Sequence, residues 1–251
     1  MLTGKSILVT GASRGIGRAV AAMAAEEGAR VLLHFGSNRE AAETVLDLLP
    51  GEGHEIFEAD LSSADAPMRL AEAVLSGPGC PDALVNNAGI FRRHPPAKIQ
   101  FDQWLRDWNA TLAVNLSAAA HLSFFFGRAM ARRGGGRIVN LSSRGAFRGE
   151  PDAPAYGASK AGMNAMGQSM AVALAPEGVL VFTVAPGFVE TDMAGEHLAG
   201  PDGDSIRAQS PLGRVASPEE IARTVLFLAF EAPESMTGAI VDVNGASYLR
   251  S

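Results

Sequence analysis

The chain has 251 residues, of which 47% are hydrophobic and 19% charged, a balance typical of a globular protein and not of a disordered one. Its single cysteine, Cys80, excludes an internal disulfide framework and a cysteine-based zinc cluster. The formal net charge of −6 argues against a general nucleic-acid partner. Because the chain shows no export signal at its start and no apolar run as long as a membrane span, we expect a cytoplasmic protein without a membrane partner.

Short apolar runs alternate with helix-like segments along the whole chain. Strands are expected at residues 6–10, 29–35, 55–59, 83–86, 137–141, 179–185 and 239–243. Helices are expected at residues 15–27, 38–49, 67–75, 101–112, 114–132, 155–175 and 218–229. Nearly continuous apolar strands are typical of a parallel sheet covered on both faces. The alternation predicts one domain over residues 1–251, an α/β, Rossmann-type, doubly wound parallel sheet with helices on both faces.

The first strand is followed by a glycine-rich turn, Thr10-Gly-Ala-Ser-Arg-Gly-Ile-Gly17. A pyrophosphate binds to free backbone N–H groups at the start of a helix, where side chains would keep it away. A glycine-rich turn at the first strand-to-helix junction therefore predicts a dinucleotide site. The turn residues expected at the cofactor are Gly11, Ser13, Arg14, Gly15, Ile16 and Gly17.

The end of the second strand bears on the choice between NAD and NADP. NAD sites usually carry a carboxylate there for the ribose 2′-OH, whereas NADP sites carry arginine. This chain has Ser37, Asn38 and Arg39, and Arg14 lies in the glycine-rich turn. Because guanidinium groups suit a phosphate, we expect NADPH to be favoured, with NAD as the alternative.

Tyr156 and Lys160 are four residues apart in an expected helix, so they share one face. A phenol has an ordinary pKa near 10, and a neighbouring ammonium lowers it. Such a tyrosine can give a proton to a carbonyl oxygen or take one from an alcohol. Ser142 and Ser143 follow the strand at 137–141, at the edge where such a sheet presents ligand groups. The alternative to a catalytic role is that Tyr156 and Lys160 are simply neighbours on the surface of a helix.

These motifs together resemble the short-chain dehydrogenase/reductase family over nearly the whole chain. The matching pieces, in the family's order, are the glycine-rich turn, Asp60-Leu61, Asn86-Asn87-Ala88-Gly89, Asn115, Ser143, Tyr156 with Lys160, and Pro186-Gly187-Phe188-Val189-Glu190-Thr191. The resemblance implies that Tyr156 is the general acid, that Lys160 lowers its pKa and binds the nicotinamide ribose, and that Ser143 binds the substrate carbonyl. Ser142 is a weaker candidate for the catalytic hydroxyl.

The resemblance also assigns the remaining site residues. Asn115 would hold a water in a proton relay to Lys160, or act only as a helix-kink residue. The residues expected around the cofactor are Asp60 and Leu61 at the adenine, Asn87, Ala88 and Gly89 at the ribose, and Pro186, Gly187, Val189 and Thr191 over the nicotinamide. For Asp60, a role as a strand-end turn residue competes. No metal site is expected, because His-x-x-Glu and cysteine pairings are missing.

Within the family, Pro186–Met193, Pro211–Arg214 and the tail from Met236 resemble 3-oxoacyl-[acyl-carrier-protein] reductases. Glu177 and Val172 depart from the arginines expected for an acidic carrier protein, so Arg132 and Arg133 are the substitutes to consider, with solvated charge as the alternative. The substrate is thus a small carbonyl compound, an acyl-carrier-protein thioester or a CoA thioester.

Two further expectations concern the loops and the assembly. Residues 188–211 form the longest stretch without periodicity, which predicts a lid or binding loop, or else a plain surface insertion. The segments 101–112 and 114–132 are apolar on more than one face. With the resemblance, this predicts a homotetramer or a homodimer.

Three functions stay open at this point. The first is an NADPH-dependent carbonyl reductase with Tyr156 as the acid. The second is an NAD-dependent dehydrogenase of secondary or sugar alcohols. The third is a dinucleotide-binding regulatory protein without turnover, which would have no need of Asn115, Ser143, Tyr156 and Lys160 together.

Overall fold

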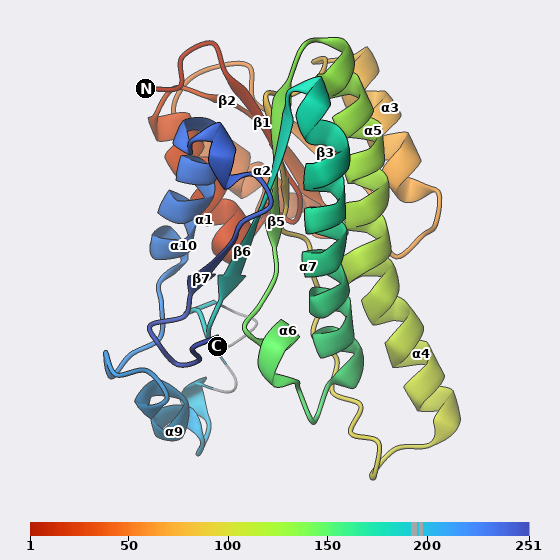
Figure 1. The fold of residues 1–251 in the computed structure, drawn as a ribbon, viewed down its shortest axis with the longest axis vertical. Helices are drawn as coiled ribbons and strands as arrows, with labels where there is room; N and C mark the ends of the chain where they lie inside the picture. Colours follow the sequence, from red (N-terminus) through yellow and green to blue (C-terminus); the bar gives the residue numbers. More distant parts are fainter. Residues whose placement is uncertain (192–194, 196–197, 251) are drawn as a thin grey trace.

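The structure is a computed structural model that describes residues 1–191, 195 and 198–250. Its centre is a seven-stranded sheet in the order β3-β2-β1-β4-β5-β6-β7, and every neighbouring pair is parallel (Figure 1). The strands are β1 (Ser6–Val9), β2 (Arg30–Phe35), β3 (Glu55–Glu58), β4 (Ala83–Asn86), β5 (Gly136–Leu141), β6 (Val179–Pro186) and β7 (Ile240–Val243). This order confirms the predicted doubly wound fold.

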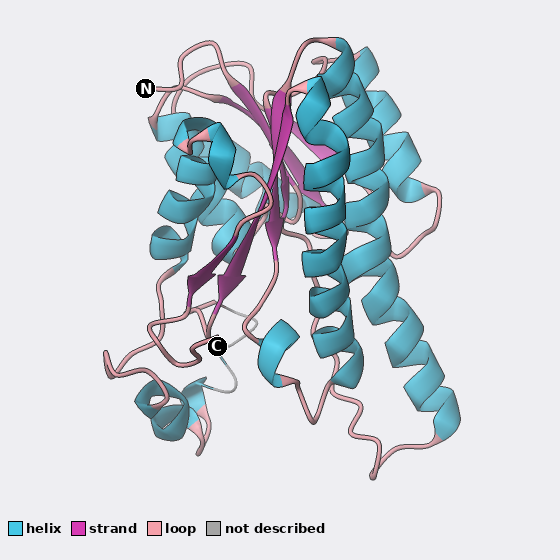
Figure 2. Cartoon of the chain, viewed as in Figure 1, coloured by secondary structure: helices cyan, strands magenta, loops and turns pink. Residues whose placement is uncertain are grey.

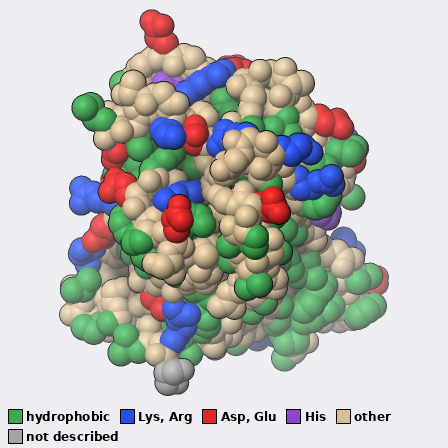
Figure 3. All heavy atoms as spheres, turned by 45° about the horizontal axis from the view of Figure 1, so that its top comes forward, with side chains coloured by type: hydrophobic (Ala, Val, Ile, Leu, Met, Phe, Trp, Pro, Cys, Tyr) green, Lys and Arg blue, Asp and Glu red, His purple; other side chains and the backbone are tan. Residues whose placement is uncertain are grey.

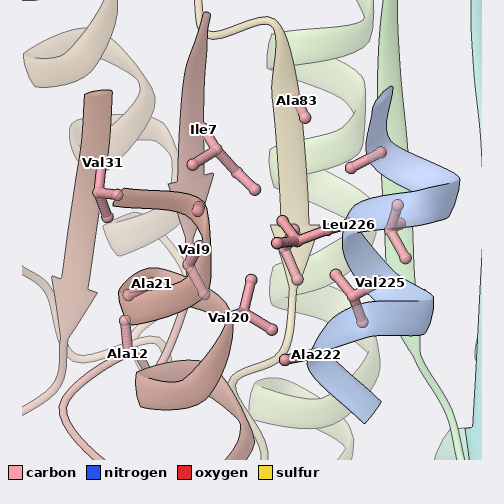
Figure 4. Close-up of a cluster of buried hydrophobic side chains, with 14 of the residues drawn as sticks. Ile7, Val9, Ala12, Val20, Ala21, Val31, Ala83, Ala222, Val225 and Leu226 are labelled. Carbon is pink, nitrogen blue, oxygen red and sulfur yellow. The ribbon is translucent and has the colours of Figure 1, made fainter. Parts of the chain in front are cut away.

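Helices cover both faces of the sheet (Figure 2). One face carries α1 (Gly15–Glu26), α2 (Arg39–Leu48) and α10 (Pro218–Leu226), and the other carries α3 (Ala66–Ser76), α5 (Ala118–Arg132) and α7 (Pro154–Leu174). Within β1, Ile7 and Val9 point to the first layer and Leu8 to the second, and all three are fully buried. Figure 4 shows the first layer, where Val20 of α1 and Val225 of α10 meet these strands.

The expected helices at 101–112 and 114–132 are one continuous helical segment. It consists of α4 (Phe101–Leu112), a π-helical turn η1 (Ala113–Ser117) and α5. Its length and composition would suffice to cross a membrane, contrary to the expectation from the sequence, but a core helix of a globular protein passes the same test. Here Leu122, Phe126 and Met130 of α5 are buried against the sheet.

Two short helices lie where only loops were expected. They are α6 (Gly145–Arg148), which follows β5, and α9 (Gly203–Ala208), which lies in the 188–211 segment. Among the described residues, the other elements are the helical turns η2 (Ala175–Glu177), η3 (Phe227–Glu231) and η4 (Glu234–Met236). Helices of four to six residues are too short to show a hydrophobic period, and this is why the sequence pattern did not predict α6 and α9.

Candidate active site

A cleft of about 450 Å³ runs along the edge of the sheet where the strands end. In a parallel sheet of this kind the ligand binds at that edge. Most of the predicted site residues line the cleft: Gly11, Ser13, Arg14, Gly15, Ile16, Ser37, Asn38, Asp60, Leu61, Asn87, Ala88, Gly89, Tyr156, Lys160, Pro186 and Thr191. The fold therefore gathers at one surface residues that are far apart in the sequence.

The glycine-rich turn is held by very close packing. A side chain at Gly17 would place its Cβ 2.3 Å from the Gly11 carbonyl oxygen and 2.6 Å from Asn87 Nδ2. Asn87 Nδ2 itself donates to the carbonyl oxygens of Thr10 and Gly11, at 2.8 and 3.1 Å. Gly15 has a φ of +53°, in the left-handed region that favours glycine. The turn thus leaves the start of α1 open to the cleft, and Asn87, directly after β4, holds the turn in place.

His34 is a site residue that the sequence reasoning missed. Its Nδ1 accepts a hydrogen bond from Gly11 N–H at 3.1 Å, and its Nε2 donates to the Ala59 carbonyl oxygen at 2.9 Å. The ring joins the glycine-rich turn to the end of β3. Burial lowers its pKa from 6.5 to about 4, so it is neutral at pH 7. A polar residue inside the apolar strand 29–35 was the available signal.

The end of β2 differs in part from the expected phosphate clamp. Asn38 lines the cleft, and its side chain caps α2 by accepting from Ala41 N–H at 3.0 Å. The Arg39 guanidinium is directed to two carboxylates, Glu58 at 2.8 Å and Glu43 at 3.6 Å, and does not line the cleft. The carboxylates of the neighbouring strand and of the next helical turn explain this orientation.

Asp60 lies at the cleft and also shapes its own turn. Its Oδ1 accepts from the backbone N–H of Ser62 at 3.0 Å and from the Ser62 hydroxyl at 2.7 Å, and these bonds lower the pKa of the carboxyl. The turn role that competed with a cofactor role is therefore present in the structure.

Tyr156 and Lys160 lie together in the first part of α7. Lys160 Nζ is 5.7 Å from the centroid of the Tyr156 ring and donates to the Leu141 carbonyl oxygen at 2.7 Å. Burial raises the pKa of Tyr156 to about 12 and lowers the pKa of Lys160 to about 8. The sequence predicted a lowered pKa for Tyr156, but in the structure this pKa is raised. Desolvation of the buried phenol outweighs the hydrogen bond from Ser143, which acts to lower the pKa.

The two serines after β5 have different partners. Ser143 hydrogen-bonds with the Tyr156 hydroxyl, which works to lower the pKa of that phenol, and its Oγ accepts from Gly145 N–H at 3.0 Å. Ser142 Oγ donates to the Lys160 carbonyl oxygen at 3.2 Å. Ser143 is thus the serine beside the phenol, and Ser142 fastens α7 to the sheet.

Asn115 lies in the π-helical turn η1 and is fully buried. Its side chain accepts from Ile90 N–H at 2.8 Å and donates to the Ile90 carbonyl oxygen at 2.9 Å and to Ser159 Oγ at 3.3 Å. A Cβ placed on Gly89 would lie 3.5 Å from Asn115 Oδ1 and 3.6 Å from Lys160 Nζ. The missing side chain at Gly89 thus lets these two groups approach the same space.

Some residues of the segment after β6 line the cleft, and others are buried in the core. Thr191 faces the glycine-rich turn, 3.3 Å from the position that a Cβ on Gly15 would take. Gly187 N–H donates to the Val243 carbonyl oxygen, and Val189 is buried in the core and bridges to Ala216. Gly187 and Val189 do not line the cleft, contrary to the expectation for the nicotinamide cover. Met193 and its neighbours at 192 and 194 lie outside the described residues.

Arg132 and Arg133 do not line this cleft in the described subunit. Arg133 donates to the Cys80 carbonyl oxygen and lies 3.5 Å from the Asp82 carboxylate, next to the start of β4. This is the edge of the sheet opposite to the cleft, where basic and acidic side chains are mixed on the surface (Figure 3). Within one subunit these arginines do not lie at the site, because α5 ends at the far edge, and their expected role in binding a carrier protein stays a prediction.

The parallel sheet, the glycine-rich first turn and the Ser-Tyr-Lys cluster define an oxidoreductase of the Rossmann class. A family model described as Enoyl-(Acyl carrier protein) reductase matches residues 11–246. The chain is 37% identical over 251 residues to D-threitol dehydrogenase of Mycolicibacterium smegmatis. The matched region covers 99% of this chain and 95% of that protein. It is 38% identical over 250 residues to 3-oxoacyl-[acyl-carrier-protein] reductase of Aquifex aeolicus, with 98% of each covered.

Solved structures show the same relationship. A putative NAD(P) dependent gluconate 5-dehydrogenase from Beutenbergia cavernae, with bound NADP, superposes with a TM-score of 0.88 at 36% identity over 98% of this chain and 97% of that chain. A structure titled ribose-5-phosphate isomerase, from Brucella melitensis, gives 0.90 at 32% identity over 98% and 93%. The chain belongs to the short-chain dehydrogenase/reductase family and is an oxidoreductase acting on CH–OH groups.

Proposed function

We propose that the protein is an NADPH-dependent reductase that converts a ketone to a secondary alcohol, with Tyr156 as the general acid. The observation that carries this proposal is the Tyr156 hydroxyl beside Ser143, with Lys160 one helical turn away, at a cleft that also contains the glycine-rich turn. A sensor without turnover would gain nothing from such a cluster.

The described residues fit a dinucleotide. Arg14 precedes the first turn of α1, where no acidic side chain opposes a phosphate in the described structure. A helix start of this kind presents backbone N–H groups to a pyrophosphate. Gly36, at the other end of the cleft, has no atom within 4 Å of the position a Cβ would take. One cleft thus extends from the end of β2 to the Tyr156–Lys160 pair.

NADP is the cofactor we favour. Arg14 faces the cleft, and Arg39 stands beside it in ion pairs with side chains that are about half exposed. Exposed ion pairs contribute roughly 0–1 kcal/mol, so a 2′-phosphate can draw Arg39 away from Glu58. The related gluconate 5-dehydrogenase structure contains NADP, which supports the same choice. NAD is the alternative for a protein that works mainly as an alcohol dehydrogenase.

The protonation states of the site suit reduction. Bound NADPH supplies a hydride to the carbonyl carbon. With a pKa of about 12, Tyr156 is protonated at pH 7, the form that a proton donor needs. The phenol gives its proton to the carbonyl oxygen, and Ser143 hydrogen-bonds to the same oxygen. Lys160, whose pKa of about 8 leaves it mostly charged at pH 7, stabilises the phenolate that remains.

The substrate belongs to one of two groups. The relatives include enzymes named for 3-oxoacyl thioesters and enzymes named for polyols or sugar acids. No described arginine of α5 lies at the cleft to hold a carrier protein, so we favour a free ketone, such as a sugar-derived ketone, over an acyl-carrier-protein thioester. A CoA thioester is the second candidate. We further propose a cytoplasmic homo-oligomer, because Phe101, Leu105 and Phe124 are exposed along α4 and α5.

A screen of NADPH and NADH oxidation tests the proposal. Acetoacetyl thioesters, diketones and sugar-derived ketones would be offered in turn with each coenzyme. We expect turnover with NADPH and a ketone, and turnover confined to thioesters would move the assignment to the carrier-protein or CoA group. A strong preference for NADH would overturn the cofactor assignment, and reduction of none of the carbonyls would contradict the reductase.

A further inference from the structure

The start of α7 is capped by a side chain from a distant loop. Helices leave their first backbone N–H groups without partners in the helix, and a side chain at the N-cap usually accepts one of them. Here the N-cap is Ala153, which has no such side chain, and Pro154 has no N–H. The Ala155 N–H donates instead to Nε2 of His94, at 3.0 Å. The next N–H, of Tyr156, donates to the Ala153 carbonyl oxygen at 2.9 Å.

The surroundings of His94 fix its ring. The residue is fully buried, and its Nδ1 faces the Arg92 carbonyl oxygen at 2.8 Å. Nδ1 therefore carries the proton, and Nε2 keeps the lone pair that accepts from Ala155. The backbone N–H of His94 donates to the Asp152 carbonyl oxygen at 2.7 Å. The His94 ring contacts the Trp104 ring edge to face, with 5.3 Å between the centroids. Backbone and ring together tie this loop to the entry of α7.

Tyr156 depends on this part of the helix more than Lys160 does. It is the third residue of α7, within the turn that frays first, whereas Lys160 is one turn further in and bound to the Leu141 carbonyl oxygen. The same loop that carries His94 also places Phe91 against the Tyr156 ring, edge to face at 5.1 Å. The loop thus contacts both the backbone and the ring of the first turn.

We propose that His94 is a positioning residue for the reaction: by capping α7 from the loop 91–96 it holds the Tyr156 hydroxyl at the reacting carbonyl. This inference rests on the proposed function of Tyr156. It adds a residue that sequence motifs do not indicate, and it gives the loop 91–96 a part in positioning the proton donor.

Three variants separate this role from general stability. His94→Phe keeps the ring and its contact with Trp104 but removes both polar bonds. His94→Gln can restore an acceptor and a donor. His54→Phe is the matched control, because His54 makes the same kind of bonds at the opposite edge of the sheet, accepting from Val31 N–H and contacting the Pro50 carbonyl oxygen, both at 3.0 Å.

We expect His94→Phe to lower kcat about 10- to 100-fold, as small displacements of a reacting group do. KM and the NADPH Kd should change by less than about 3-fold, because the cleft and its glycine-rich turn are untouched, a pattern that marks an interaction made in the transition state. His94→Gln should recover most of kcat, and His54→Phe should leave kcat unchanged. Equal losses of kcat in the two phenylalanine variants, or no loss in His94→Phe, would overturn the proposal.

A measurement without substrate keeps the proposal separate from the proposed function. The chain has two tyrosines, Tyr156 and Tyr248, so Tyr248→Phe leaves a single tyrosine signal when the ring carbon is labelled with ¹³C. His94→Phe in that background should shift or broaden the Tyr156 signal, and His54→Phe should not. An unchanged signal overturns the positioning role even if no substrate is found, whereas a shifted signal in a protein without turnover contradicts only the reductase.

Discussion

The two halves of the sheet edge that carries the site are built in different ways. The half at the ends of β1, β2 and β4 is held by side chains that bind backbone atoms. The Asn87 side chain binds two carbonyl oxygens of the glycine-rich turn, and the His34 ring binds a backbone N–H and a carbonyl oxygen. In the half around β5, β6 and β7, beside the cleft, long side chains from separate segments also contact one another. The guanidinium groups of Arg144 and Arg148 both donate to Gln209 Oε1, at 2.6 and 3.3 Å.

This difference teaches how one fold serves many substrates. Contacts to backbone atoms at strand ends tolerate little change. Side-chain contacts between loops can be exchanged without disturbing the sheet. The relatives of this chain are named for threitol, gluconate and 3-oxoacyl thioesters, so the same fold accompanies different substrates.

The largest expected effect comes from adding one methyl group to the backbone-held half. In Gly17→Ala the new Cβ would lie 2.3 Å from the Gly11 carbonyl oxygen and 2.9 Å from Ala12 Cα, so α1 must move away from the turn. We expect the free energy of unfolding to fall by roughly 3 kcal/mol or more and NADPH binding to be lost. Chemical denaturation and fluorescence titration would measure both.

Gly36→Ala is the control, because a Cβ there has no atom within 4 Å. Its free energy of unfolding should stay within about 0.5 kcal/mol of the parent. If Gly17→Ala were as stable as this control, the close packing would not be what holds the turn.

The second largest expected effect is a pH dependence of the free energy of unfolding, which arises from His34 in the same half. Burial lowers the pKa of His34 from 6.5 to about 4, so between these values the unfolded chain binds the proton that the folded protein excludes. The stability from neutral His34 is complete above pH 6.5 and is lost as the pH falls to about 4, up to roughly 3 kcal/mol.

His34→Gln removes this titration and retains an acceptor and a donor. Denaturation of both proteins at several pH values between 4 and 7 should show a steeper loss of stability on acidification for the parent. Parallel curves would show that His34 is not the group responsible.

The smallest effect is expected in the other half. Gln209→Ala removes the oxygen shared by Arg144 and Arg148, and Arg144 is buried. We expect a loss of roughly 1–2 kcal/mol in stability and a KM for the carbonyl substrate raised several-fold, with the NADPH Kd unchanged. The exposed Gln168 of α7, replaced by alanine, is the control. A change in NADPH Kd equal to that in KM would mean that the two halves are not separate.

The sequence predicted the strands and the local motifs better than the contacts between distant side chains. The parallel strands, the glycine-rich turn and the Tyr156–Lys160 pair follow from local patterns that the structure reproduces. The orientation of Arg39 toward Glu58 was not predictable, because it depends on which side chains the neighbouring strand brings close. The same holds for the raised pKa of Tyr156, which reflects burial and not spacing along the helix.

The substrate side escaped prediction for a further reason. The helices α6 and α9 are too short to give a periodic pattern, and the contacts of Arg144 with Gln209 join segments 65 residues apart. His94 shows the same limit, since its partner Ala155 is 61 residues away. Motifs predict what a strand end carries, whereas contacts between loops emerge only in three dimensions.

The role of Tyr156 is tested most directly by single-turnover oxidation of NADPH in the parent and in Tyr156→Phe, with a carbonyl that the parent reduces. Removing one hydroxyl should slow the chemical step by about 10³-fold or more and leave the NADPH Kd within about 2-fold. A variant that reduces the carbonyl at the parent's rate would show that the proton comes from another group.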